Sequence, residues 1–233
     1  MSRTFTSRGK GTRVTTSGIG RRRAQARREA NPNYVEKRLQ MVRAAAVLFK
    51  EKGFEATTLA DIAEAVGDDR ASIYYYVESK RELLLEAVTG VSNANLELAK
   101  SVRNQAELSP AERIRLFIAA TLKTYDDNYP QVYVYIQEDM ARVAPDDEPW
   151  ALAMAGQVKE FEKLIDDLIR DAIADGTFRA DLDPQLVAKG LWGMLNWTHR
   201  WHRPGSGASV EQIADTFATM FLDGVMAPGE AEG

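Results

Sequence analysis

The sequence predicts an all-α protein built from two helical domains. Along most of the 233 residues, apolar side chains recur at spacings of three and four, and the alternation typical of half-buried strands is almost absent. Residues that start and stop helices punctuate the chain repeatedly. These signals predict about nine helices, at residues 32–52, 58–66, 70–76, 79–104, 109–128, 130–142, 148–175, 183–203 and 208–226.

Capping residues support the expected helix boundaries in order. Asn31 followed by Pro32 is typical of a helix start, and Gly53 is placed to end that helix. The capping-box pattern, in which Ser precedes Glu or Gln by three residues, begins at Ser79, Ser109 and Ser209. An Asp-Pro pair opens the helix at 183–203, and glycine stands at two expected helix ends, Gly176 and Gly205.

Residues 57–84 predict two short helices around a tight turn, followed by the capped start of a third. Gly67 ends the first helix where a positive φ costs least, and Asp69 is placed to cap the second. That second helix, expected at 70–76, carries Ile73 for burial and three consecutive tyrosines. The tyrosines suit either half-buried packing or contact with DNA from a helix in the major groove. A helix in that groove needs side chains that are stiff and apolar but end in a hydrogen-bonding group. The pattern as a whole favours DNA reading.

The segment from about Arg38 to Val88 resembles the DNA-binding domain of the TetR family of bacterial repressors. The matching features are the AAAVLFKEKGFEATT run, the TTLADIA helix start, the glycine turn, the IYYYV helix and the following Ser-Lys pair. In that family a recognition helix enters the major groove while its neighbours hold phosphates. The resemblance implies phosphate contacts for Thr58, Ser72, Tyr76 and Lys80, and base-facing or base-adjacent positions for Arg70, Ala71, Tyr74 and Tyr75. Asp68 replaces the apolar residue usual after the turn glycine, so part of the turn is expected to face away from DNA.

Charge is distributed unevenly along the chain. Residues 1–30 hold nine Lys or Arg and one Glu, a local charge of +8, so the total of −4 leaves −12 on the remainder. This Gly/Ser/Thr-rich segment has too few apolar residues for a core, and we expect a disordered basic arm. It is either a solvated tail or an arm that follows the DNA backbone or enters the minor groove.

The remaining chain is expected to form two domains. A helix-turn-helix DNA-binding domain covers residues 31–80, a ligand-binding and dimerisation domain covers 81–226, and a tail covers 227–233. The boundary lies in the long helix after Ser79, because its first half completes the DNA-binding domain and its second half packs with later helices. A continuous helix transmits movement between domains, since no flexible linker absorbs it.

Composition excludes several other classes of protein. No run approaches the roughly 20 uninterrupted apolar residues that a membrane-spanning helix needs, and the N-terminus lacks the apolar core of a signal peptide. Because the chain contains 0 cysteines, it has neither disulfides nor thiolate ligands. We therefore expect a cytoplasmic protein without membrane association, cofactor or metal.

Three expected helices of the second domain carry Tyr, Met and Thr among their apolar residues. Such faces are most often plain core, but this composition holds more adaptable and polar side chains than a dry core requires. The pattern predicts a cavity for a mostly apolar ligand between the helices beginning near Ser109, Pro130 and Glu148. The candidate ligand-binding residues are Phe117, Thr121, Tyr125, Tyr133, Met154, Val158, Phe161 and Trp192.

The segment from Gly190 to Gly224 is similar to the C-terminal part of a TetR subgroup that includes regulators of fatty-acid and steroid breakdown. In that subgroup the inducer is often a coenzyme A (CoA) thioester, and the last two helices pair with their symmetry mates in a four-helix bundle. The resemblance implies a homodimer whose interface holds Leu186, Met194, Ile213, Phe217, Met220 and Phe221. A CoA group needs cations at the cavity mouth, and the candidates are Arg142, Lys159 and Arg200.

These observations predict a homodimeric repressor that binds a palindromic double-stranded DNA operator and is released by a largely apolar effector, such as an acyl-CoA or steroid-derived thioester. The alternatives are a multidrug-type regulator, an effector-free DNA-binding regulator and an enzyme built on a helical bundle. The enzyme interpretation is the weakest. Neither histidine, His199 or His202, has an obvious carboxylate in its local motif, and no nucleophile elbow, zinc-protease helix or phosphate loop is present.

Overall fold

The computed structural model describes residues 32–137 and 148–227, and every regular element within them is helical. The helices are α2 (Pro32–Lys52), α3 (Leu59–Ala65), α4 (Ile73–Tyr76), α5 (Lys80–Arg103), α6 (Pro110–Asp127), α7 (Gln131–Gln137), α9 (Pro149–Ala174), α10 (Pro184–Trp197), the 3-10 turn η1 (Thr198–Arg200) and α11 (Val210–Val225). This arrangement confirms the predicted all-α class. No helix in the described ranges is long and apolar enough to cross a membrane. The expected basic arm at 1–30 lies outside those ranges.

Side-chain caps begin several helices, as predicted. Ser109 and Ser209 form complete capping boxes with Glu112 and Gln212. Each cap satisfies a main-chain N–H group that has no partner within its own helix. The helix expected at 183–203 is shorter in the structure, where α10 gives way to η1.

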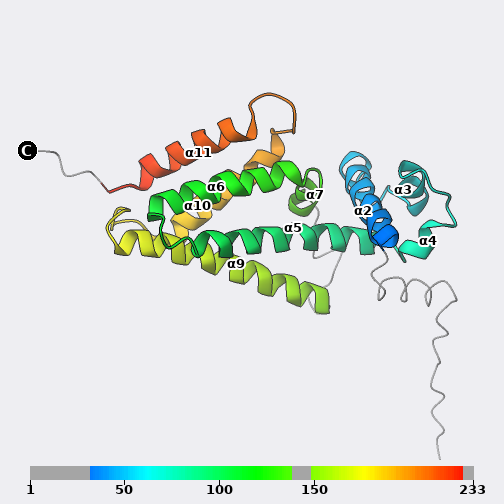
Figure 1. Cartoon of the computed structure of the whole chain (residues 1–233), viewed down its shortest axis with the longest axis horizontal. Coiled ribbons are helices and arrows are strands. Elements are labelled where there is room, and N and C mark those ends of the chain that lie inside the picture. The colour runs from blue at the N-terminus through cyan, green and yellow to red at the C-terminus, as the bar shows by residue number, and fades with distance from the viewer. Residues whose placement is uncertain (1–31, 138–147, 228–233) are drawn as a thin grey trace, which may run out of the picture.

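The helices divide between a small head and a longer body (Figure 1). Helices α2, α3 and α4 form the head at one end, and α5 runs from the head into the body between α6 and α9. Helix α11 lies along α6, and α10 packs against α9. The C-terminal end of α11 lies at the far end of the body from the head.

Two apolar cores meet along α5. In the head, Met41 and Phe49 of α2, Ile62 of α3 and Ile73 of α4 are buried together against the first turns of α5. In the body, the later turns of α5 pack in a second core that contains Phe117 of α6. Burial of a side chain such as Ile73 contributes about 1.5–3 kcal/mol. That contribution matters because α4 has only 4 residues and few hydrogen bonds of its own.

Candidate nucleic-acid interface and effector cavity

The recognition segment begins with a turn that the Asp69 carboxylate organises. Gly67 adopts a φ of +69°, and Asp69 accepts hydrogen bonds from the main-chain N–H groups of Ala71 at 2.7 Å and Ser72 at 2.8 Å. The Ser72 hydroxyl also donates to this carboxylate, and together these bonds hold the pKa of Asp69 below its ordinary value. The recognition helix therefore begins later than predicted, at Ile73.

The predicted base-reading residues at the start of this segment face solvent. Arg70 and Ala71 are exposed beside the turn, and Tyr74 is 40% exposed on α4. These three side chains remain available to a partner outside the head. Their contact with bases stays a prediction.

The next two tyrosines are partly committed to packing. The ring of Tyr76 stacks on that of Tyr34 at 5.3 Å between centroids, and Tyr75 meets both rings edge-on. Burial raises the pKa of Tyr76 above its ordinary value. Of the two alternatives for the tyrosines, half-buried packing therefore applies to Tyr75 and Tyr76 in the unbound protein. Tyr34, against which they pack, is a partner that the sequence analysis missed.

Two predicted phosphate contacts have partners inside the head. The Thr58 hydroxyl caps α3 by accepting the main-chain N–H of Asp61 at 3.2 Å, and it remains exposed. The ammonium group of Lys80 donates to the main-chain oxygens of Phe54 at 2.6 Å and Glu55 at 2.9 Å. Two of its three hydrogens are thus used. Lys80 therefore holds the loop before α3 through Phe54 and Glu55, a role that the sequence did not indicate.

Arg38 is a structural anchor of the head that the sequence analysis also missed. It is only 6% exposed, and its guanidinium donates to the main-chain oxygen of Tyr76 and to the carboxylates of Glu82 and Glu86. Burial disfavours the charged form, but the hydrogen bonds and charges of Glu86 and Glu82 outweigh burial and raise the pKa of Arg38. The end of the recognition helix is therefore tied to both α2 and α5.

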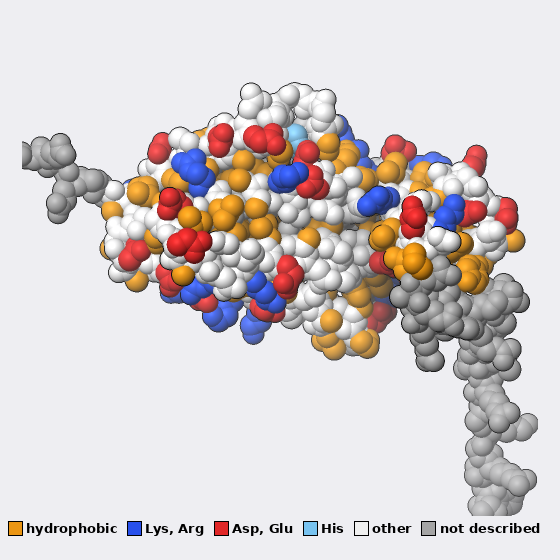
Figure 2. Space-filling model, in the orientation of Figure 1, with side chains coloured by type: hydrophobic (Ala, Val, Ile, Leu, Met, Phe, Trp, Pro, Cys, Tyr) orange, Lys and Arg blue, Asp and Glu red, His pale blue; other side chains and the backbone are white. Residues whose placement is uncertain are grey.

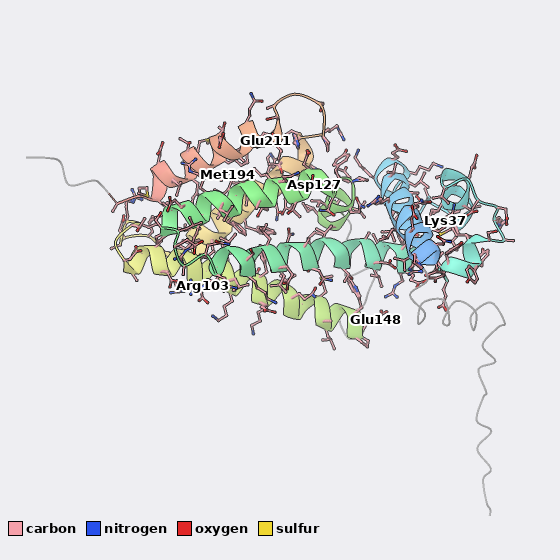
Figure 3. The ribbon with its side chains drawn as sticks, viewed as in Figure 1. Lys37, Arg103, Asp127, Glu148, Met194 and Glu211 are labelled. Atoms are coloured by element: carbon pink, nitrogen blue, oxygen red, sulfur yellow. The ribbon has the colours of Figure 1, made fainter. Side chains whose placement is uncertain are left out.

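Lys37 holds the turn between α3 and α4 (Figure 3). Its ammonium group donates to the main-chain oxygen of Val66 at 3.1 Å and pairs with the Asp68 carboxylate at 3.1 Å. Asp68 is thereby held against α2. This contact explains how the turn tolerates an acidic residue close to the predicted DNA contacts.

Two sets of side-chain contacts join the head to the body. Arg81 of α5 pairs with Glu148, the residue that precedes α9 (Figure 3). On the other side, the Lys50 ammonium lies 4.6 Å from the centroid of the Tyr129 ring and 5.6 Å from that of Tyr133. Tyr133, a predicted ligand residue, therefore lies at the junction between head and body.

A cavity of about 380 Å³ lies between α6, α9 and α10. Of the predicted ligand residues, Phe117, Phe161 and Trp192 line this cavity. Val158 lines an adjoining chamber of about 40 Å³ that shares the side chains of Phe161 and Trp192. The third wall of the larger cavity is α10 rather than the predicted helix near Pro130. Its volume falls within the range of small-molecule sites.

Four predicted ligand residues do not line either space. Tyr125 is buried, its hydroxyl donates to Asn196 at 2.7 Å, and burial raises its pKa. Met154 packs against the core of the head, and Tyr133 lies at the junction. Thr121 is 1% exposed, and its hydroxyl oxygen has no hydrogen-bond partner within the described residues. Helical periodicity predicted that these four residues lie on apolar helix faces, but it did not predict which residues those faces contact.

The larger cavity has charged residues in its lining. They are Lys159, Glu162, Lys163, Asp166 and Lys189. Lys163 pairs with Asp167 and Asp166 with Arg170, whereas no carboxylate in the described ranges lies within ion-pair distance of Lys159 or Lys189. Figure 2 shows Lys and Arg side chains along the edge of the body formed by α9. Of the predicted cations, Arg200 lies over the Trp197 ring instead, and Arg142 falls outside the described residues.

Helices α10 and α11 expose large apolar side chains. Leu186 is 67% exposed and Met220 63% exposed. The predicted interface residues that are half-buried are Met194, which Figure 3 labels, Phe217 and Phe221. Ile213 is different, because it is only 5% exposed and packs in the core of the body. Exposed apolar residues of this size mark contact surfaces when they cluster.

The histidines connect helices of the body. His202 Nε2 lies 2.9 Å from the Asp126 carboxylate of α6, a partner distant in sequence that local motifs could not reveal. His199 contacts Gln137 of α7 and the main-chain oxygen of Asn196. Within the described part of the chain, no three His, Cys, Asp or Glu residues cluster as metal ligands.

A short helix that follows a tight turn in a three-helix head, which a long helix joins to an all-helical body, is the arrangement of a helix-turn-helix transcriptional regulator. Family profiles agree: that of the tetR family of bacterial regulatory proteins matches residues 41–87, and that of the tetracyclin repressor-like C-terminal domain matches residues 107–225. The chain belongs to the TetR family of transcriptional regulators, and it is not an enzyme.

Relatives with similar sequence and structure include a transcriptional repressor. The repressor KstR2 of Mycolicibacterium smegmatis is 28% identical over 189 residues, which are 81% of this chain and 90% of KstR2. The structure of the ketosteroid transcriptional regulator KstR2 of Mycobacterium tuberculosis has a TM-score of 0.75 at 26% identity, covering 82% of this chain and 95% of that one. AibR, solved with isovaleryl coenzyme A and operator DNA, shares the fold with a TM-score of 0.66 at 22% identity, covering 79% and 97%.

Proposed function

We propose that the chain is a homodimeric repressor whose operator is released by an effector with a largely apolar body and one anionic end. The observation that carries this proposal is the cavity between α6, α9 and α10. Its wall is apolar at Phe117, Phe161 and Trp192, and its lining also holds Lys159 and Lys189. An apolar ligand that ends in a carboxylate or phosphate complements both features.

The relatives support a thioester as the form of this effector. KstR2 of Mycobacterium tuberculosis is a ketosteroid transcriptional regulator, and the AibR structure contains isovaleryl coenzyme A. A CoA thioester joins an apolar acyl group to anionic phosphates. We therefore propose an acyl-CoA or steroid-derived thioester, whose acyl group occupies the cavity and whose phosphates lie near the lysines. The regulated genes would belong to lipid or steroid breakdown.

Operator binding in this proposal requires two copies of the chain. Recognition helices of a dimer lie about 34–36 Å apart when they occupy successive major grooves of a palindrome. The proposed contact between the copies consists of the exposed parts of α10 and α11, through Leu186, Met194, Phe217, Met220 and Phe221. In each head, the proposed DNA contacts are Thr58, Arg70, Ala71, Ser72, Tyr74, Tyr75, Tyr76 and Lys80.

Helix α9 connects the cavity to the head. It supplies Phe161 to the cavity, and its N-terminal end is joined to α5 by the Arg81–Glu148 pair and by a 2.9 Å hydrogen bond from Trp150 to Thr89. A ligand that displaces α9 therefore shifts the part of α5 to which the head is anchored. Release also requires the effector to bind the released arrangement more tightly than the DNA-bound one, because equal affinity shifts no equilibrium.

A cationic, drug-like effector is the second candidate. The Glu162 and Asp166 carboxylates in the cavity lining favour it. Fluorescence anisotropy of a labelled operator, first selected from random-sequence duplexes with the protein itself, separates the two. Acyl-CoA thioesters, their free acids and cationic amphiphiles are added at matched concentrations.

We expect thioesters to release the operator at lower concentrations than the other compounds. Release by the cationic amphiphiles alone would assign a multidrug sensor. No release by any compound would indicate an effector-free regulator. Either of these results would contradict the proposed effector class.

A further inference from the structure

The small chamber beside the cavity differs from it in chemistry. Its volume is about 40 Å³, and it is lined by Ser92, Asn95, Tyr135, Val158, Phe161, Glu162 and Trp192. Phe161, Glu162 and Trp192 also line the larger cavity, so the two spaces adjoin. None of the three lysines of the larger cavity lines the chamber. The chamber is therefore a polar but cation-free extension of the effector site.

Asn95 is the exceptional residue of this chamber. It is 5% exposed, and its side-chain oxygen has no hydrogen-bond partner within the described ranges. A buried polar atom without a partner costs free energy, and a leucine of similar shape would avoid that cost. The neighbouring Ser92 differs, because its hydroxyl donates to the Gln157 side chain at 3.2 Å. The unused acceptor thus points to a ligand atom that supplies a donor.

The remaining lining residues restrict what that ligand atom is. About 10–15 Å³ of such space admits a water molecule, so a chamber of about 40 Å³ holds only a small group. The Glu162 carboxylate repels a second anion. Burial raises the pKa of Tyr135, which keeps its phenol neutral beside the same space. These conditions favour a neutral group over a charged one.

We propose that the chamber is a specificity subsite for a hydroxyl group on the apolar body of the effector, which donates its hydrogen to the Asn95 side-chain oxygen. This inference rests on the proposed function, because the larger cavity must hold the apolar body. The effector then has a hydroxyl group at one end and an anionic group at the other. Asn95 distinguishes it from the equivalent compound without the hydroxyl.

Paired probes test the subsite with the full-length protein. Saturated fatty acids of increasing length and their terminally hydroxylated counterparts are titrated by calorimetry. We expect the hydroxylated acid to bind about tenfold more tightly at the chain length that reaches the chamber, the effect of one added hydrogen bond. Asn95→Leu should remove this preference while still binding the plain acid. Asn104→Leu, at an exposed position directly after the same helix, should keep it.

The outcomes separate the subsite from the effector site. Equal binding of both members of every pair by the wild-type protein would overturn the subsite, whether or not Asn95→Leu folds, and would leave the proposed function standing. Retention of the preference in a folded Asn95→Leu protein would also overturn it. Failure of every acid to bind would count against the subsite and the proposed effector class together.

Discussion

The buried guanidinium of Arg38 donates a hydrogen bond to the main-chain oxygen of Tyr76, the last residue of the recognition helix α4. The same guanidinium holds Glu82 and Glu86 of α5. Because α4 has only 4 residues, its orientation depends on such contacts from outside. Movement of α5 therefore reaches the recognition helix through Arg38.

Arg38→Leu should weaken operator binding about tenfold or more and lower the free energy of unfolding by about 1–3 kcal/mol, because two carboxylates and a carbonyl lose their donor. Anisotropy and denaturant titration measure the two effects. Arg43→Leu, at an exposed position of the same helix, is the control for added apolar surface. Operator affinity that survives Arg38→Leu unchanged would remove Arg38 from the proposed coupling.

Lys80→Met should destabilise the head by about 1 kcal/mol, because the main-chain oxygens of Phe54 and Glu55 lose a donor while the apolar stem remains. A phosphate contact has a different consequence, a decrease of about one in the slope of log affinity against log salt concentration. Salt titration of operator binding distinguishes the roles. An unchanged slope would remove Lys80 from the proposed DNA contacts, and an unchanged stability would show that Lys80 does not hold the loop.

Met220→Glu should produce monomers, because Met220 is 63% exposed on α11 and the added charge is duplicated across a two-fold interface. Leu152→Glu is the matched control, since Leu152 is 62% exposed on α9 and away from that surface. Analytical ultracentrifugation measures both. A dimeric Met220→Glu protein, or equal disruption by the control, would place the interface elsewhere.

The stability of the turn before α4 should depend on pH, because the Asp69 carboxylate accepts its hydrogen bonds more strongly when it is ionised. Hydrogen bonds from Ser72 and Ala71 lower its folded pKa below the unfolded value of about 3.9, so its stabilisation is present above that value and is lost as pH falls through the folded pKa. The advantage of the wild-type protein over Asp69→Asn should shrink as the pH falls below about 4, through the unfolded pKa and then the lower folded pKa. Denaturant titrations of both proteins follow this difference. An advantage independent of pH would contradict the assignment.

Lys159→Gln combined with Lys189→Gln should raise the concentration of thioester needed for operator release about tenfold or more, because charge-assisted hydrogen bonds contribute about 1.5–3 kcal/mol. Binding to the operator itself should not change. Lys123→Gln is the control, because Lys123 pairs with Asp127 and does not line the cavity. Loss of response in the control as well would indicate a general charge effect.

Local signals in the sequence predicted the helices well. Ser109 and Ser209 mark the starts of their helices, and Gly67 and Asp69 mark the turn between α3 and α4. These signals can be recognised because a capping side chain bonds main-chain groups only a few residues away. The family resemblance identified the head for the same reason, since its motifs are contiguous.

Long-range packing was the part that the sequence could not predict. The partner of His202 is Asp126, 76 residues away, and the carboxylates that hold Arg38 lie 44 and 48 residues away. Tyr133 and Ile213 show the same limit. Each lies on a predicted apolar face, but the periodicity of one helix does not specify which helix covers that face.

Native mass spectrometry of the protein with its selected operator duplex, before and after addition of an acyl-CoA thioester, tests the central claim most directly. The account predicts two chains on each duplex at first, and then free duplex together with a dimer that carries one thioester per chain. A single chain on the duplex, or a thioester-bound dimer that stays on the DNA, would contradict it.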